Sequence, residues 1–197
     1  MTRTTLYKAH YFAMMIGAGT LALAVVTYFQ FSPVAIVLVF MALLVPGRIL
    51  GFFWRDLLRG LRLLNARQFA ESKRHSERFL EKVRKSPWIK NLVWLSSSTY
   101  SHDPEVLALN NLGAAEVQLG QMEVAKANLQ KAIELDPKCP LPFVNLGVLH
   151  ESNGEAEEAI RCFQQAARLG YANRLSDRIV RASQTQFAGR DGAGISP

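Results

Sequence analysis

The first quarter of the chain is one long apolar region without charge. Residues 9–47 contain no Asp, Glu, Lys or Arg. As a single α-helix they would extend about 58 Å, at roughly 1.5 Å per residue, whereas a bilayer core is about 30 Å thick. A polar and turn-forming sequence at residues 30–33 divides the region. The pattern therefore predicts two helices, at about residues 11–29 and 33–53, that form a transmembrane hairpin.

Two other interpretations of the apolar region remain open. A hairpin buried inside a soluble protein is disfavoured, because the remaining residues are too few to cover it. A cleaved signal peptide would account for the basic start, Arg3 and Lys8, and for Ala22-Leu23-Ala24, a sequence typical of a cleavage site. Cleavage would still leave the second apolar stretch in the membrane.

An amphipathic helical pattern begins after Pro46-Gly47. Its apolar face contains Leu50, Phe53, Trp54, Leu57, Leu58, Leu61 and Leu64. Its other face is basic, and a basic amphipathic helix with aromatic side chains is typical of the membrane interface. We expect Arg48, Trp54, Arg55, Arg59 and Arg62 to contact membrane lipid. In the alternative interpretation, the second transmembrane helix runs on past the membrane with Arg48 snorkelling.

A charged helical segment comes next, at residues 65–86, with a thin apolar stripe. It predicts a solvated stalk that packs partly on the C-terminal residues and ends at Pro87. The short apolar sequence WIKNLVWL, residues 88–95, could dock on the membrane or on the C-terminal domain, and we favour the domain. Residues 96–101 form a linker.

The net charge of +7 is distributed unevenly. Residues 48–90 hold 12 Lys/Arg against 4 Asp/Glu, whereas residues 106–171 hold 5 against 8. A basic segment beside an apolar one favours anionic lipid as the partner, and no nucleic-acid motif is present. Because the connector at residues 30–33 has no basic residue, the positive-inside rule places both ends in the cytoplasm. The sequence thus predicts a two-pass integral protein of a bacterial inner membrane.

The C-terminal half contains an internal repeat with a period of 34 residues. VLALNNLGAAEVQLGQMEVAKANLQKAIELDP, from Val106, aligns with PLPFVNLGVLHESNGEAEEAIRCFQQAARLGY, from Pro140. The matched pairs are Asn111/Asn145, Leu112/Leu146, Gly113/Gly147, Gly120/Gly154, Ala125/Ala159, Leu129/Phe163 and Ala132/Ala166. A fixed period of this length indicates stacked helix-turn-helix units.

In period and in the placing of small and large residues, both copies resemble the tetratricopeptide repeat family. The resemblance covers residues 106–137 and 140–171. Some positions depart from the family pattern: Leu109 and Phe143 stand where Trp is frequent, Glu116 and His150 where Tyr is usual, and Tyr171 replaces the closing Pro. The resemblance implies two helix pairs, with the glycines at 120 and 154 ending their first helices.

Two repeats are few for a stacked array, so we expect additional helices to cover them. A capping helix with Leu175, Ile179 and Ala182 on one face is predicted after the second repeat. A degenerate helical pair is predicted at residues 79–95, closed by His102-Asp103-Pro104. The expected fold is all-α, with a hairpin at 1–53, a basic helix, stalk and linker at 54–104, repeats and cap at 105–183, and a disordered tail at 184–197.

We find no residues that would carry catalysis. The sequence has no phosphate loop, nucleophile elbow or metal-binding spacing, and its two cysteines, Cys139 and Cys162, match no metal or redox motif. His150 is interpreted as a packed or surface histidine. The chain is therefore expected to be no enzyme and to need no cofactor or metal.

In the tetratricopeptide family, the inner face of each first helix binds a peptide or a partner helix. The matching positions here are Leu107, Asn110, Ala114, Val117, Gln118, Leu141, Val144, Val148, Glu151 and Ser152. The lysines that clamp a C-terminal carboxylate in some members are absent from these positions. The sequence predicts a membrane-anchored adaptor or scaffold that recruits or helps assemble a protein partner. Alternatively, the chain is a permanent subunit of a larger membrane complex. The sequence does not fix its oligomeric state.

Overall fold

The computed structural model describes residues 47–95 and 100–171, together with residues 13–14, 16–21, 24, 34, 37 and 41. About half of each predicted transmembrane helix therefore lies outside the described residues, and the capping helix and the tail lie outside them entirely. Among the residues described, no helix combines the length and the hydropathy that a membrane span requires.

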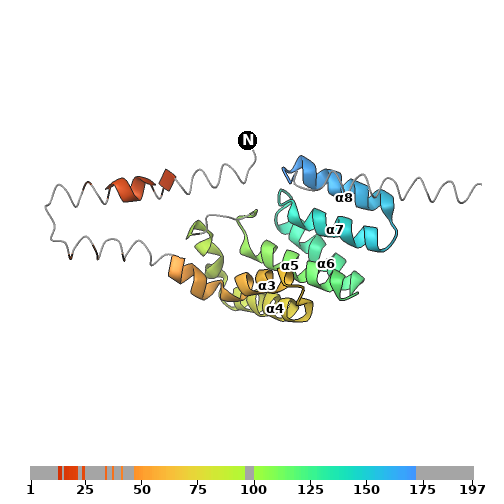
Figure 1. The fold of residues 1–197 in the computed structure, drawn as a ribbon, viewed down its shortest axis with the longest axis horizontal. Coiled ribbons are helices and arrows are strands. Elements are labelled where there is room, and N and C mark those ends of the chain that lie inside the picture. Colours follow the sequence, from red (N-terminus) through yellow and green to blue (C-terminus); the bar gives the residue numbers. More distant parts are fainter. Residues whose placement is uncertain are drawn as a thin grey trace, which may run out of the picture.

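The described part of the chain from residue 47 onward is a stack of helices (Figure 1). A helix at residues 47–53 leads into α3 (Arg55–Asn65) and α4 (Phe69–Lys85), which are followed by a 3₁₀ helix, η1 (Pro87–Leu95). The repeats then supply α5 (Pro104–Gln118), α6 (Met122–Leu135), α7 (Leu141–Ser152) and α8 (Ala156–Arg168). The expected all-α fold is confirmed for these residues, and the helices pack as three successive pairs.

The first pair, α3 and α4, begins with a helix that continues through Trp54. The Trp54 amide donates to Leu50 O at 2.8 Å and the Leu58 amide donates to Trp54 O at 2.9 Å, so helical hydrogen bonding runs on from residue 47 into α3. Trp54 and Leu57 are buried against Phe79, which lies on α4. The part of the apolar face that contains Trp54 and Leu57 therefore packs on protein, whereas Leu58 and Leu61 are each 44% exposed.

The prediction of a helical pair at residues 79–95 is wrong. Residues 69–85 form one uninterrupted helix, and its partner is α3, which approaches it closely at Gly60. A Cβ on Gly60 would lie only 3.1 Å from Ser76 Oγ. The segment predicted as a solvated stalk is thus part of the core, with Ser72, Ser76, Phe79 and Val83 buried.

The two repeats form the helix pairs that their sequences predict. In each pair a glycine of the first helix faces a large side chain of the second: Gly113 faces Leu129, and Gly147 faces Phe163. After α5 and α7 the chain turns at Gly120, with φ +74°, and at Gly154, with φ +78°. These are left-handed conformations that glycine adopts without strain, as the sequence implied.

The connection into the first repeat differs from the prediction. Asp103 caps the N-terminus of α5, because its carboxylate accepts the Glu105 amide at 2.8 Å, and Pro104 is the first helical residue. These residues therefore begin α5, and the prediction that they end an earlier helical pair is wrong. In η1, Ile89 is buried, so this segment docks on the helical domain as favoured.

Candidate partner-binding surfaces

The inner face of the first repeat is largely occupied by the protein itself. Leu107 packs against the cluster formed by Trp54, Leu57 and its neighbours. Asn110 is 5% exposed and accepts a hydrogen bond from Asn145 Nδ2 at 2.8 Å. Val117 is also 5% exposed and packs with residues of α6 and α7. The prediction that Asn110 and Val117 face a ligand is wrong, because successive repeats meet at these side chains.

The inner face of the second repeat is more open. Leu141, Val144 and Val148 are half-buried, and both valines pack against the Ala159–Phe163–Ala166 cluster beneath them. The accessible part of the predicted inner face is therefore a mixed polar and apolar strip. We call this the inner strip, and it consists of Ala114, Gln118, Leu141, Val144, Val148, Glu151 and Ser152.

A buried polar link joins α4 to the first repeat, and sequence reasoning missed it. Glu116, almost completely buried, lies with its carboxylate 3.2 Å from Lys73 Nζ and accepts a hydrogen bond from Asn128 Nδ2 at 2.7 Å. Lys73 also donates to Gln121 Oε1 at 2.5 Å. The sequence did contain a signal of this link, because Glu116 stands where the repeat pattern usually has Tyr. Its partner Lys73 was not recognised, because the sequence analysis assigned residues 65–86 to a solvated stalk.

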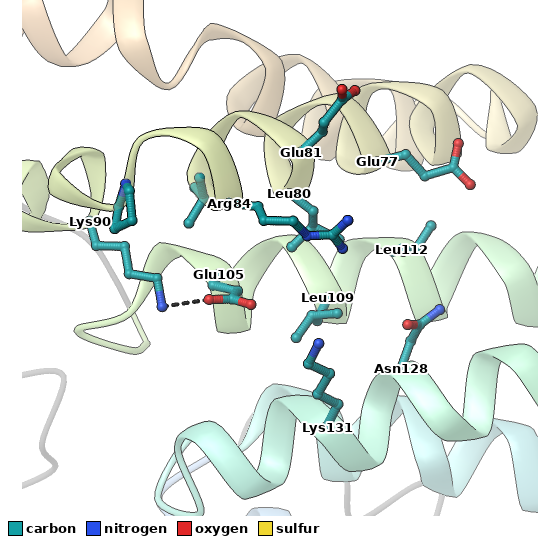
Figure 2. Close-up of a pocket in the computed structure, with 12 residues that line it drawn as sticks. Glu77, Leu80, Glu81, Arg84, Lys90, Glu105, Leu109, Leu112, Asn128 and Lys131 are labelled. Atoms are coloured by element: carbon teal, nitrogen blue, oxygen red, sulfur yellow. Dashed lines mark ion pairs between the residues drawn. The ribbon is translucent and has the colours of Figure 1, made fainter.

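An open cleft lies between α4 and α6, above α5 (Figure 2). Its volume is ≈ 610 Å³, within the ~300–1,000 Å³ typical of ligand-binding clefts. Leu80, Val83, Leu109 and Leu112 form an apolar floor, and charged or polar side chains surround it: Glu77, Glu81, Arg84, Lys90, Glu105, Asn128 and Lys131. None of the predicted inner-face residues lines this cleft.

The carboxylates around the cleft are paired with lysines. Glu77 lies 4.0 Å from Lys73, Glu81 lies 2.7 Å from Lys85, and Glu105 lies 2.5 Å from Lys90. Burial lowers the pKa of Lys90, but the hydrogen bonds and charges of Glu105 and Asp103 outweigh it and raise that pKa above its ordinary value. Lys90 therefore stays protonated and fixes η1 to the start of α5.

A second exposed feature is an aromatic surface beside the helix at residues 47–53. We call it the aromatic ledge; it consists of Phe52, Phe53, Trp88 and Lys82. The Phe53 ring lies 5.2 Å from Phe52 and 4.9 Å from Trp88, both edge to face. Lys82 Nζ lies over both phenylalanine rings and donates to Phe53 O at 3.0 Å. Phe52 is 68% exposed and Trp88 51%.

The four predicted interface arginines form an exposed row on the same helix. Arg48, Arg55, Arg59 and Arg62 are all exposed, and none has an acidic partner in the part of the chain that the structure describes. Trp54 does not belong with them. It is 2% exposed, and its Nε1 donates to Ile89 O at 3.3 Å, so the prediction that its ring meets lipid is wrong. The ring fills the space between α3, α4 and η1 instead.

The described residues offer little reactive chemistry. No group of three or more His, Cys, Asp or Glu within them could hold a metal ion. Cys139 is buried, and burial raises the pKa of the Cys162 thiol, which disfavours the reactive thiolate. His150 is buried and pairs through Nδ1 with Glu155 at the turn into α8. That the chain is no enzyme and needs no cofactor remains a prediction.

Comparison with protein families addresses the repeats directly. The family described as TPR repeat matches residues 113–154, and the family described as Tetratricopeptide repeat matches residues 143–169. No curated protein matches the chain. The matches begin within α5 and continue to the end of α8, so they leave out the α3–α4 pair. Residues 113–169 of this chain are therefore tetratricopeptide repeats, a module that suggests protein–protein interaction.

Proposed function

We propose that this chain is a membrane-anchored adaptor, whose repeats recruit or help assemble a protein partner at the cytoplasmic face of a membrane. The repeats at residues 113–169 support the protein-binding part. One observation carries the membrane part: the aromatic ledge and the row of unpaired arginines adjoin the helix that comes after the charge-free residues 9–47. Aromatic rings and basic side chains are the groups that membrane interfaces favour.

The described apolar residues before position 47 give further support. Met14, Ile16, Leu21, Val34, Val37 and Met41 lie in helical conformation and are between 54% and 68% exposed. Large apolar side chains that are more than half exposed in this number favour a site that something else covers. A bilayer is the covering that agrees with the absence of charge in this stretch of sequence.

Fluorescence quenching by lipid tests the membrane part. The full chain is reconstituted into phosphatidylcholine vesicles containing phosphatidylglycerol, with bromine atoms on the acyl chains near the headgroups. Tryptophan emission should be quenched, and Trp88→Phe should remove much of that quenching. The reference chain and both variants carry Trp94→Phe, because Trp94 is the third tryptophan of the sequence. Trp54→Phe is the matched control and should not reduce the quenched fraction, because this ring is buried in protein. A chain that fails to float with the vesicles would contradict the anchoring itself.

Orientation requires a separate measurement. Reporter fusions after Lys8 and after Pro197 should both give the cytoplasmic signal, as the placing of basic residues implies. If the fusion after Pro197 instead reports the opposite side of the membrane, the proposal of a cytoplasmic partner is contradicted.

Photocrosslinking in the cell tests partner binding. A photoreactive residue at Gln118 or Glu151, both exposed on the inner strip, should crosslink to a specific protein. The same residue at Gln130, exposed on α6, is the control and should not. If a partner is recovered equally well by residues 1–53 alone, the alternative of a permanent subunit held through the hairpin is favoured instead.

A further inference from the structure

We propose that the row of four exposed arginines on the helix at residues 47–65 is a docking surface for anionic phospholipid headgroups. We call it the arginine row; it consists of Arg48, Arg55, Arg59 and Arg62. The row is the free end face of a three-pair array, so the array stands end-on at the membrane, with α8 at its far end (Figure 1). This inference rests on the proposed membrane anchoring, to which it adds the class of lipid and the face of the protein that meets it.

The α3–α4 pair has the same internal register as the two repeats. In all three pairs a closely packed glycine lies five residues before the end of the first helix, and a three-residue turn follows. The middle residue of each turn has a positive φ, and the last residue donates its amide to the carbonyl five residues earlier at 2.9 Å. The glycines are Gly60, Gly113 and Gly147, and the positive-φ residues are Arg67, Gly120 and Gly154. The α3–α4 pair is therefore structurally equivalent to a third repeat, with an arginine in place of the turn glycine.

This register identifies the surface that the arginine row occupies. In α5 and α7 the positions that correspond to Arg55, Arg59 and Arg62 are buried, whereas in α3 they are exposed. Ala108, which corresponds to Arg55, belongs to the same core cluster as Phe79 on α4. The full sets are Ala108, Leu112 and Ala115 in α5, and Pro142, Leu146 and Leu149 in α7. The row therefore stands where each later repeat packs on the pair before it, and no described residue covers it.

The geometry of the row suits a planar array of phosphates. Helical hydrogen bonding continues from residue 47 into α3, so the four arginines lie within roughly 60° of arc at 3.6 residues per turn. From Arg48 to Arg62 the row extends about 21 Å, at 1.5 Å per residue. Each guanidinium group offers a phosphate two parallel hydrogen bonds. The opposite face of the helix, with Trp54 and Leu57, stays in the core.

The charge of the row is uncompensated. Asp56 is the one acidic residue between positions 47 and 65, and its carboxylate lies 2.9 Å from His75 Nδ1. None of the four arginines has an acidic partner among the residues that the structure describes. Charges of both signs would make an end face soluble, whereas four like charges in a line repel one another until an anionic surface neutralises them.

The position of the row in the chain favours lipid as the source of the anions. Arg48 comes directly after the charge-free residues 9–47. Phe52, which is 68% exposed, falls on the same side of the helix as the row, and aromatic side chains favour the headgroup region. A nucleic acid would neutralise the arginines equally well, but it would leave the adjoining apolar side chains in water.

A fluorescent reporter beside the row tests docking in the full chain. An NBD group is attached to Leu58→Cys, a position 44% exposed on α3, after Cys139→Ala and Cys162→Ser have removed the native thiols. The chain is reconstituted into vesicles of phosphatidylcholine alone, or with about 30% phosphatidylglycerol, which supplies the anionic headgroups. Emission should be at least about twofold brighter in the anionic vesicles, and about 0.5 M salt should reduce the difference by screening the charges.

A matched pair of variants identifies the arginines. Arg55→Gln/Arg59→Gln should remove most of the brightening, because each basic residue contributes about fivefold in affinity for an anionic surface. Arg74→Gln/Arg78→Gln is the control: it has the same spacing and the same change in charge, at two exposed positions of α4, and should keep the brightening. Circular dichroism melts establish that each variant is folded.

A reporter at Gln130→Cys, exposed on α6, tests the end-on arrangement and should show no dependence on lipid charge. Equal emission in the two kinds of vesicle, equal losses in the two double variants, or equal brightening at positions 58 and 130 would overturn the proposal. Brightening that requires added polyuridylic acid instead of phosphatidylglycerol would assign the row to nucleic acid and overturn it as well. In each of these cases, flotation of the chain with neutral vesicles would leave the membrane anchoring standing. A chain that floats with neither kind of vesicle contradicts both the anchoring and the docking.

Discussion

Lys73 on α4 and Glu116 on α5 form an ion pair, 3.2 Å from Nζ to carboxylate, that joins the N-terminal helices to the first repeat. The Glu116 side chain is 2% exposed and that of Lys73 23%, so water reaches the pair from one side only. Asn128 supplies a further hydrogen bond to the carboxylate. A charged residue is thus tolerated where the tetratricopeptide pattern usually has Tyr, because α4 provides the opposite charge.

Breaking this pair should destabilise the protein substantially. We expect Lys73→Met to cost about 2–4 kcal/mol in the free energy of unfolding, because it leaves the Glu116 carboxylate buried without a counter-ion. Adding Glu116→Leu in the same chain should recover most of that loss, since the uncompensated charge is then gone. Urea unfolding of the full chain in detergent, followed by circular dichroism, measures both values.

The exposed Lys85–Glu81 pair on α4 provides the control for that prediction. Lys85→Met should cost less than about 1 kcal/mol, because water already solvates both groups. Equal costs for Lys73→Met and Lys85→Met would mean that the buried pair does not hold α4 to the repeats.

The glycine in the first helix of each repeat is required by close packing. A Cβ on Gly113 would lie 2.6 Å from Leu129 Cγ, so Gly113→Ala should overpack the pair and cost about 1–3 kcal/mol. Gly51 is the control, because it also lies in a helix but no described residue comes within 4 Å of its Cβ position. Gly51→Ala should stabilise the chain by about 0.5–1 kcal/mol through helix propensity. A neutral Gly113→Ala would mean that α5 and α6 are not in contact there.

The Ser76 hydroxyl lies buried at the α3–α4 contact and has no hydrogen-bond partner among the residues that the structure describes. Ser76→Ala should therefore be neutral or stabilise the protein by up to about 1 kcal/mol, because the alanine removes a polar group that loses its contact with water on folding. Ser72 differs, since its Oγ donates to Gly60 O at 2.8 Å, and Ser72→Ala should cost about 1 kcal/mol. Thermal melts of both variants test this difference; a larger loss for Ser76→Ala would contradict it.

The repeats could be predicted from sequence because they obey a fixed period. Each copy places glycine, alanine and a large apolar residue at matching positions, and the structure pairs the helices accordingly. The α3–α4 pair also has a closely packed glycine, Gly60, but this glycine faces Ser76 rather than a large side chain, and the pair does not follow the 34-residue period. Residues 86–103 separate α4 from α5, whereas only residues 136–140 separate α6 from α7. Comparison at a constant spacing therefore misses it.

The candidate site was harder to predict, because periodicity gives the face of a helix but leaves open which element covers that face. Asn110 and Val117 lie at inner-face positions in the sequence, yet neighbouring repeats bury both. Arg84 and Lys131 are far apart in the chain and have no motif in common, so only the fold brings them to one cleft. Trp54 was expected at the membrane interface but is buried, whereas Trp88, in a segment expected to dock on the helical domain, is 51% exposed.

The last prediction concerns those two tryptophans. Trp54 is 2% exposed, its ring lies edge to face with Phe79 at 6.5 Å, and its indole donates to Ile89 O. Trp54→Ala should therefore cost about 3–5 kcal/mol in the free energy of unfolding, by opening a cavity between α3, α4 and η1. Trp88 is 51% exposed, and Trp88→Ala should cost less than about 1 kcal/mol while reducing quenching by brominated lipid. Urea unfolding of the two variants in detergent compares them. If both substitutions cost little and only Trp54→Ala reduces quenching, then α3 lies on the membrane rather than in the core, as the sequence pattern first suggested.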